Sequence, residues 1–264
     1  MIRKLTIYIT LLYLCINCSS PDNNKEIYND IQSPEEIYIS GKRNFDSQNF
    51  ILAREKFNEL KKLYPLSKET IQAEIMIGFI SYVQMEYDDS ILQFDKIINK
   101  YPSHKNLDYV YYMKAMCYYE QITHEGLDGN YNDLSLGAFN QVINRFPNSQ
   151  YAKDSRQKII LVKSNQAAKH MNIGRFYLKE KKYLAALNRF KIVTENYSMT
   201  KFTPEALHRI VETYYELGLI EESFNTASVL GYNYPRSKWY KYSYNLLKQN
   251  NENKNFLDKL KDIF

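Results

Sequence analysis

Residues 78–102 read GFISYVQMEYDDSILQFDKIINKYP, and this stretch decides the fold. Gly78 opens it, Ser90 follows twelve residues later, Phe94 comes after four more, and Pro102 closes it after another eight. Small residues at the first two positions let two helices approach closely, and the phenylalanine fills the space toward a neighbouring repeat. The proline ends the second helix because it has no N–H. The stretch therefore predicts one helix–turn–helix unit.

The same spacing recurs four more times along the chain. The copies end in KLYP at 62–65, NRFP at 144–147, ENYS at 195–198 and YNYP at 232–235. Phenylalanine stands eight residues before the last position in every copy except the fifth, which has Ala227. This is the tetratricopeptide pattern. Since each repeat leaves an apolar face that only its neighbour can bury, we expect an all-α superhelix of five helix–turn–helix repeats.

Two intervals between repeats exceed the usual length and predict the domain organisation. The interval between the second and third repeats contains an insertion near 123–133, with Gly126 and Gly129 as helix breakers. The next interval has apolar residues at helical spacing and no proline or glycine before Gly174, which predicts an extended helix. We therefore assign repeats one to three to 34–148, and the long connecting helix with repeats four and five to 149–247.

Composition excludes several classes of protein. The chain has 264 residues, of which 44% are hydrophobic, so it is too apolar to be disordered. Eight glycines and seven prolines are too few for an all-β protein with many tight turns. The formal charge of +5 is spread along the chain and forms no basic stripe, which argues against binding to nucleic acid.

The N-terminus reads as an export signal. Residues 1–17 combine a basic start with an apolar run of about ten residues, which is typical of a secretory signal and too short for a spanning helix. The following Cys15-Ile16-Asn17-Cys18-Ser19 resembles the cleavage box of bacterial lipoproteins, with Cys18 as the lipidated residue. An ordinary cleaved signal is the alternative. Residues 18–33 are polar and predict a linker between the lipid and the repeats.

The C-terminal tail, 248–264, predicts an amphipathic helix. Its apolar residues lie on one helical face: Phe256, Leu257, Leu260, Ile263 and Phe264. One interpretation is a capping helix that covers the last repeat, and the other is contact with a membrane or a partner.

Catalytic signatures are absent from the sequence, and so is metal-ligand spacing among its four histidines. Asp128, Asn130 and Asn132 match the first ligands of a calcium loop, but the glycine and glutamate that such a loop requires are missing. Cys117 lies in an aromatic stretch and is expected to be buried. We therefore predict a binding protein rather than an enzyme, with no metal and no cofactor apart from covalent lipid on Cys18.

Several longer stretches carry a family resemblance. GRFYLKEKKYLAALNRFKIVTENYSMTKFTPEALHRIVETYYELG at 174–218, RFPNSQYAKDSRQKI at 145–159, LDYVYYMKAMCYY at 107–119 and YPLS at 64–67 are similar to the BamD family of outer-membrane β-barrel assembly lipoproteins. The resemblance implies a scaffold that is lipid-anchored on the periplasmic face of the outer membrane. Its C-terminal repeats would dock on the periplasmic domains of BamA, and its N-terminal repeats would receive unfolded barrel substrates. Other assembly lipoproteins are further expected partners.

The resemblance also implies site residues. Arg189, the arginine of AALNR at 185–189, is the candidate for partner docking, since an arginine pairs bidentately with a carboxylate. The alternative for Arg189 is a solvent-facing helix charge. Asn188, Glu205 and Tyr177 are assigned to the same neighbourhood.

Tyr38 and Tyr64 are the candidates for substrate binding in the N-terminal half. The alternative function is that of another periplasmic tetratricopeptide-repeat adaptor lipoprotein, serving cell division or peptidoglycan coordination.

Overall fold

The computed structural model describes residues 32–122 and 129–248, all of whose regular elements are α-helices. The signal peptide, Cys18, most of the linker and the tail beyond residue 248 lie outside the described residues. The helices are α2 (Pro34–Asp46), α3 (Phe50–Leu63), α4 (Lys68–Val83), α5 (Tyr87–Lys100), α6 (Leu107–Glu120), α7 (Gly129–Arg145), α8 (Gln150–Lys179), α9 (Tyr183–Asn196), α10 (Thr203–Glu216), α11 (Ile220–Asn233) and α12 (Lys238–Lys248).

The chain divides into two compact units between Ala73 and Glu74, within α4. In the first unit, α2 packs on α3. Helix α2 begins with a capping box, in which the Glu36 amide donates to Ser33 Oγ at 3.3 Å and the Ser33 amide donates to Glu36 Oε2 at 2.7 Å. These bonds satisfy two donors that a helix start otherwise leaves without partners.

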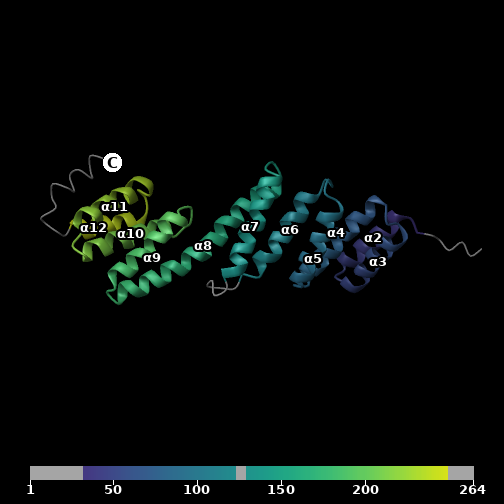
Figure 1. The fold of residues 1–264 in the computed structure, drawn as a ribbon, viewed down its shortest axis with the longest axis horizontal. Helices are drawn as coiled ribbons and strands as arrows, with labels where there is room; N and C mark the ends of the chain where they lie inside the picture. The colour runs from purple at the N-terminus through teal and green to yellow at the C-terminus, as the bar shows by residue number, and fades with distance from the viewer. Residues whose placement is uncertain (1–31, 123–128, 249–264) are drawn as a thin grey trace, which may run out of the picture. The chain divides into compact units, whose positions relative to one another are not determined.

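In the second unit, each helix from α5 to α11 packs on the next, and α12 lies against both α10 and α11 (Figure 1). The described helices therefore form five helix pairs of tetratricopeptide type, from α2/α3 to α10/α11, followed by α12. Among the described residues, no helix combines the length and apolar character that crossing a membrane requires.

Three repeats use glycine to seat a phenylalanine ring. A Cβ added to Gly78 would lie 2.7 Å from Phe94 Cε1, which no real side chain tolerates. The corresponding distances are 2.6 Å in repeat one and 2.5 Å in repeat four, for the pairs Gly41/Phe57 and Gly174/Phe190. Each of the three rings is fully buried. The phenylalanine therefore packs first on the glycine of the same repeat, and not only toward the next repeat as the sequence suggested.

The fifth repeat solves the same packing problem with different residues. Val211 stands where the glycine would be, and Ala227 stands where the phenylalanine would be. The aromatic ring comes instead from Phe224, which is buried in one cluster with Val211, Ala227 and Leu247. The alignment on Ala227 therefore missed the residue that supplies the ring.

The turns inside four repeats share one backbone conformation. Gln48, Met85, Lys181 and Gly218 have φ angles of 60°, 62°, 55° and 74°. In each turn the following amide bonds a carbonyl five residues back, as in the bond from Lys182 N to Tyr177 O at 2.9 Å. Three of these residues are not glycine, although this left-handed region favours glycine.

The two long intervals form helices to different extents. Helix α8 is a single helix of 30 residues over the stretch for which an extended helix was expected. Gly129 is the first residue of α7, so it begins a helix instead of breaking one, and residues 129–133 of the predicted insertion are helical. Residues 123–128, including Gly126, lie outside the described part of the chain.

Candidate functional site

The four predicted partner-binding residues lie on three consecutive helices of the second unit. Tyr177 is on α8, Asn188 and Arg189 are on α9, and Glu205 is on α10. Helix α9 packs against both α8 and α10. The fold therefore places the four residues on neighbouring elements, while their role in docking stays a prediction.

Arg189 is half-buried on α9. Within 32–122 and 129–248, its side chain makes no ion pair or hydrogen bond. Its charge is felt by His170 of α8: burial lowers the pKa of His170, and Arg189 and then Lys169 lower it further. The guanidinium thus keeps its donors available for a carboxylate from outside the described residues.

Glu205, by contrast, is engaged inside the chain. Arg175 of α8 binds it bidentately, with Nε donating to Oε1 at 2.8 Å and Nη2 donating to Oε2 at 2.8 Å. Arg209 Nε lies 3.7 Å from Glu205 Oε1. The Glu205 side chain is only 12% exposed. A carboxylate held in this way clamps α8 to α10, and a partner would have to compete with Arg175 for it.

The clamp extends to the C-terminal helix through residues that the sequence did not single out. Arg209 donates to Glu212 Oε2 at 2.7 Å, and its guanidinium carbon lies 5.5 Å from the ring centroid of Trp239 on α12. The Trp239 ring also lies 5.4 Å from His208. Arg175 and Glu205 are 30 residues apart, so helical periodicity within one repeat cannot reveal their pairing.

Tyr177 and Asn188 differ in exposure. Tyr177 is half-buried and packs against the cluster formed by α8, α9 and α10, with its ring 5.7 Å from that of Phe176. Asn188 is exposed, as is Phe176 at 57%. Asn188 and Phe176 can therefore reach a partner, whereas Tyr177 contributes mainly to the core.

Tyr38 and Tyr64 both lie in the first unit and take part in its packing. The Tyr38 ring is 5.7 Å from that of Phe57, and burial raises the pKa of its hydroxyl. Tyr64 Oη donates to the Gln32 carbonyl at 2.9 Å. Both rings are half-buried, so part of each stays accessible.

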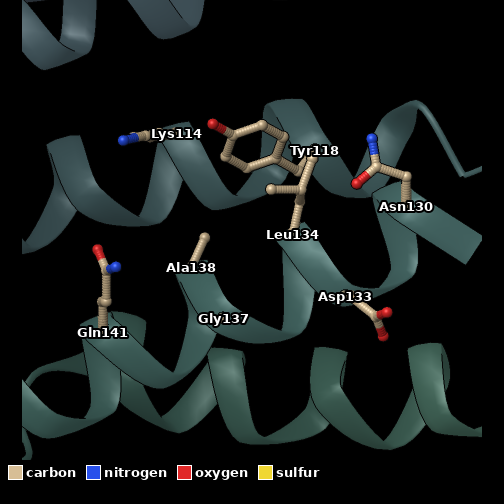
Figure 2. Close-up of a pocket in the computed structure, with 8 residues that line it drawn as sticks. All are labelled: Lys114, Tyr118, Asn130, Asp133, Leu134, Gly137, Ala138 and Gln141. Carbon is tan, nitrogen blue, oxygen red and sulfur yellow. The ribbon is translucent and has the colours of Figure 1, made fainter.

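A groove of about 310 Å³ lies between α6 and α7 (Figure 2). Lys114 and Gln141 line one end of it, and Asn130 and Asp133 line the other. Between these ends lie Tyr118, Leu134, Gly137 and Ala138. The groove thus has a cation near one end, an anion near the other and a floor of small and apolar groups.

The Cys117 thiol and the hydrogen-bonded pair of His208 and Ser243 are both buried in the second unit. Burial raises the pKa of Cys117 to about 11, so its thiol stays protonated at neutral pH. The hydrogen bond of 2.9 Å between His208 Nδ1 and Ser243 Oγ is buried, and Ser243 has no exposure through which a substrate could reach it. No group of three metal-ligating side chains occurs in the described part of the chain.

Comparison with known proteins identifies the family. The family model described as YfiO, outer membrane lipoprotein, matches residues 30–230. The chain belongs to this family. It is 41% identical over 226 residues to the outer membrane protein assembly factor BamD of Rickettsia prowazekii, covering 85% of this chain and 90% of that protein.

Other relatives are similar over comparable lengths. The BamD of Caulobacter vibrioides is 39% identical over 216 residues, which cover 82% of this chain and 71% of that protein. Among solved structures, the TPR2AB domain of yeast Sti1 in its pHSP90 complex is 11% identical, with 80% of each chain covered and a TM-score of 0.49.

Proposed function

We propose that this chain is a non-enzymatic scaffold for the assembly of outer-membrane proteins, anchored on the periplasmic face of the outer membrane by lipid on Cys18. Its relatives are assembly factors, and it shares with them most of its length. Repeats four and five dock a BamA-like barrel protein through its periplasmic domains. The N-terminal repeats receive unfolded barrel substrates, with Tyr38 and Tyr64 as candidate contacts.

The observation that supports the docking surface is the contrast between Arg189 and its charged neighbours. Arg175 forms an ion pair with Glu205, and Arg209 forms one with Glu212, both within the chain. Arg189 has no such partner among the described residues, and the nearby His170 is held toward its neutral form. An uncompensated guanidinium on a rigid helix is suited to recognise a carboxylate of another protein.

The decisive experiment is a detergent pull-down of the tagged chain from its own envelope, followed by mass spectrometry. We expect a large barrel protein with periplasmic repeat domains to be recovered, and to be lost with Arg189→Glu. Lys182→Glu is the matched control, because it makes the same change in charge at an exposed position at the start of α9.

The pull-down tests the role of Arg189 and the scaffold function separately. Equal recovery with both variants would remove Arg189 from the docking surface and leave the scaffold function standing. Recovery of division or peptidoglycan proteins in place of a barrel protein would support the adaptor alternative instead.

A further inference from the structure

We propose that the groove between α6 and α7 is a binding site for an extended peptide segment that carries an acidic and a basic side chain about three residues apart. The acidic group lies at the Lys114 end and the basic group at the Asp133 end. This inference goes beyond the scaffold function and does not depend on docking at Arg189.

Gly137 is the first observation that carries the proposal. An added Cβ at Gly137 would meet nothing within 4 Å, whereas at Gly41, Gly78 and Gly174 it would collide with a phenylalanine ring. Gly137 is exposed in the interior of α7, where glycine weakens a helix relative to alanine. Internal packing therefore does not explain this glycine. A glycine does allow another backbone to lie close against the helix.

The charges at the two ends are the second observation. Lys114 lines its end of the groove, and its Nζ donates to Asp95 Oδ1 of α5 at 2.6 Å. An ammonium has three donors, so two remain for a ligand. Asp133 is exposed at the opposite end, where Gln166 Nε2 donates to its Oδ1 at 3.5 Å and its charge raises the pKa of Tyr197. Opposite charges at the two ends select a ligand with the complementary pair and fix its direction.

The length and lining of the groove indicate a short stretch of peptide. Asp133 and Gln141 are eight residues apart on α7, which corresponds to about 12 Å along the helix. An extended chain covers this distance with about four residues. The amide of Gln141 and the hydroxyl of Tyr118 can donate to and accept from a peptide backbone. Leu134, 39% exposed, offers an apolar contact between the charged ends.

The test is a selection of random octapeptides displayed on phage against the full-length chain in detergent. We expect the enriched peptides to share an acidic and a basic residue three or four positions apart. A selected peptide, synthesised with a fluorescent label and blocked ends, is then measured by fluorescence anisotropy. Gly137→Val should weaken its binding about tenfold or more, because the isopropyl group fills the floor of the groove.

Three further variants make the test specific. Asn140→Val is the matched control, because it adds the same side chain to an exposed position of α7 outside the groove. It should leave the affinity unchanged. Lys114→Gln should abolish the preference for the acidic residue over its amide. Arg189→Glu should bind the peptide normally, so that failure of the docking surface is distinguishable from failure of the groove.

Three results would overturn the proposal. One is a selection that enriches no peptide, and another is enrichment of peptides without the charge pair. The third is equal affinity of the selected peptide for the Gly137→Val and Asn140→Val chains, with thermal unfolding confirming that both are folded.

Discussion

In both repeat two (α4/α5) and repeat five (α10/α11), one position of the first helix faces one position of the second helix. In repeat two the first position is small and the second large, and in repeat five this order is reversed. Repeat two has Gly78 opposite Phe94. At the equivalent positions repeat five has Val211 and Ala227, with the missing ring supplied by Phe224. What stays constant is a serine hydroxyl that donates to the carbonyl of the first position, at 2.8 Å from Ser90 and at 2.9 Å from Ser223.

The two repeats therefore share a filled space between their helices and one serine hydrogen bond, although the residue types that fill this space differ. Protein interiors are packed to crystal density, so a large side chain at one position requires a small one opposite. A serine between the two helices meets a carbonyl in both repeats because an unpaired buried hydroxyl is costly.

The strongest test is to convert the pair of repeat two into that of repeat five. Phe94→Ala alone should lower the free energy of unfolding by about 3–5 kcal/mol through the cavity it leaves. Gly78→Val alone should lower it by about 1–3 kcal/mol through collision with the ring. The double variant should lose less than the sum by about 1 kcal/mol or more, because the valine fills the cavity. Urea unfolding followed by circular dichroism measures all three, and strict additivity would contradict the exchange of volumes.

Repeat five also has a buried histidine, His208, whereas helices α4 and α5 of repeat two contain no histidine. Burial lowers the pKa of His208 to about 4, and the charges of Glu212 and Glu205 offset this only in part. The unfolded chain binds the proton near pH 6.5, so above that value both states are neutral and His208 adds no pH dependence. As pH falls from 6.5 to 4, the unfolded state gains the proton first, and stability should decline by up to about 3 kcal/mol.

The single tryptophan, Trp239, lies 5.4 Å from the His208 ring and reports this transition by its fluorescence. His208→Gln should remove the part of the decline that belongs to this group, while the rest of the acid response stays. Identical pH profiles of stability for the two chains would show that folding does not lower the pKa of His208.

The shared serine can be tested in both repeats. Ser90→Ala and Ser223→Ala should each cost about 1 kcal/mol, since each removes a buried hydrogen bond from the serine hydroxyl to a helical carbonyl. The loss should be larger for Ser90, because Cys117 Sγ donates to its hydroxyl at 3.3 Å and would also lose a partner. Thermal unfolding of the two variants measures the difference, and a larger loss for Ser223→Ala would contradict this reasoning.

The smallest expected effect concerns the turns. Met85 in repeat two and Gly218 in repeat five occupy the same left-handed position, with φ of 62° and 74°. Met85→Gly should raise the free energy of unfolding by about 0.5–1 kcal/mol, and Gly218→Ala should lower it by a similar amount. Effects of the same sign in chemical denaturation would show that the two turns are not equivalent.

Sequence spacing predicted the helix pairs because a small residue, a phenylalanine and a proline recur at fixed offsets. It misplaced the ring of repeat five, since the alignment demanded a phenylalanine at the position of Ala227 while Phe224 reaches the same space from one turn earlier. It also treated Gly129 as a breaker, although glycine is tolerated at a helix start.

The site was predicted less completely than the fold. Spacing and resemblance brought Tyr177, Asn188, Arg189 and Glu205 to adjoining helices, but side-chain pairing across repeats is a property of three-dimensional packing. The bond from Arg175 to Glu205 and the ring of Trp239 under Arg209 could therefore be found only in the structure. The one local signal for the groove was an exposed glycine within a helical pattern, at Gly137.

The length of the 30-residue helix α8 fixes the rotational angle between the residues that pack on its two halves. Its first half packs with Leu107, Tyr111 and Val142 through Ala152, and its second half packs in the cluster of α9 and α10 through Met171. Inserting one residue between these halves would rotate the second half, together with α9 and α10, by about 100° relative to the residues packed on the first half. Insertions near seven residues restore the angle after about two turns. We therefore expect relatives whose α8 differs in length to differ by a whole number of helical turns.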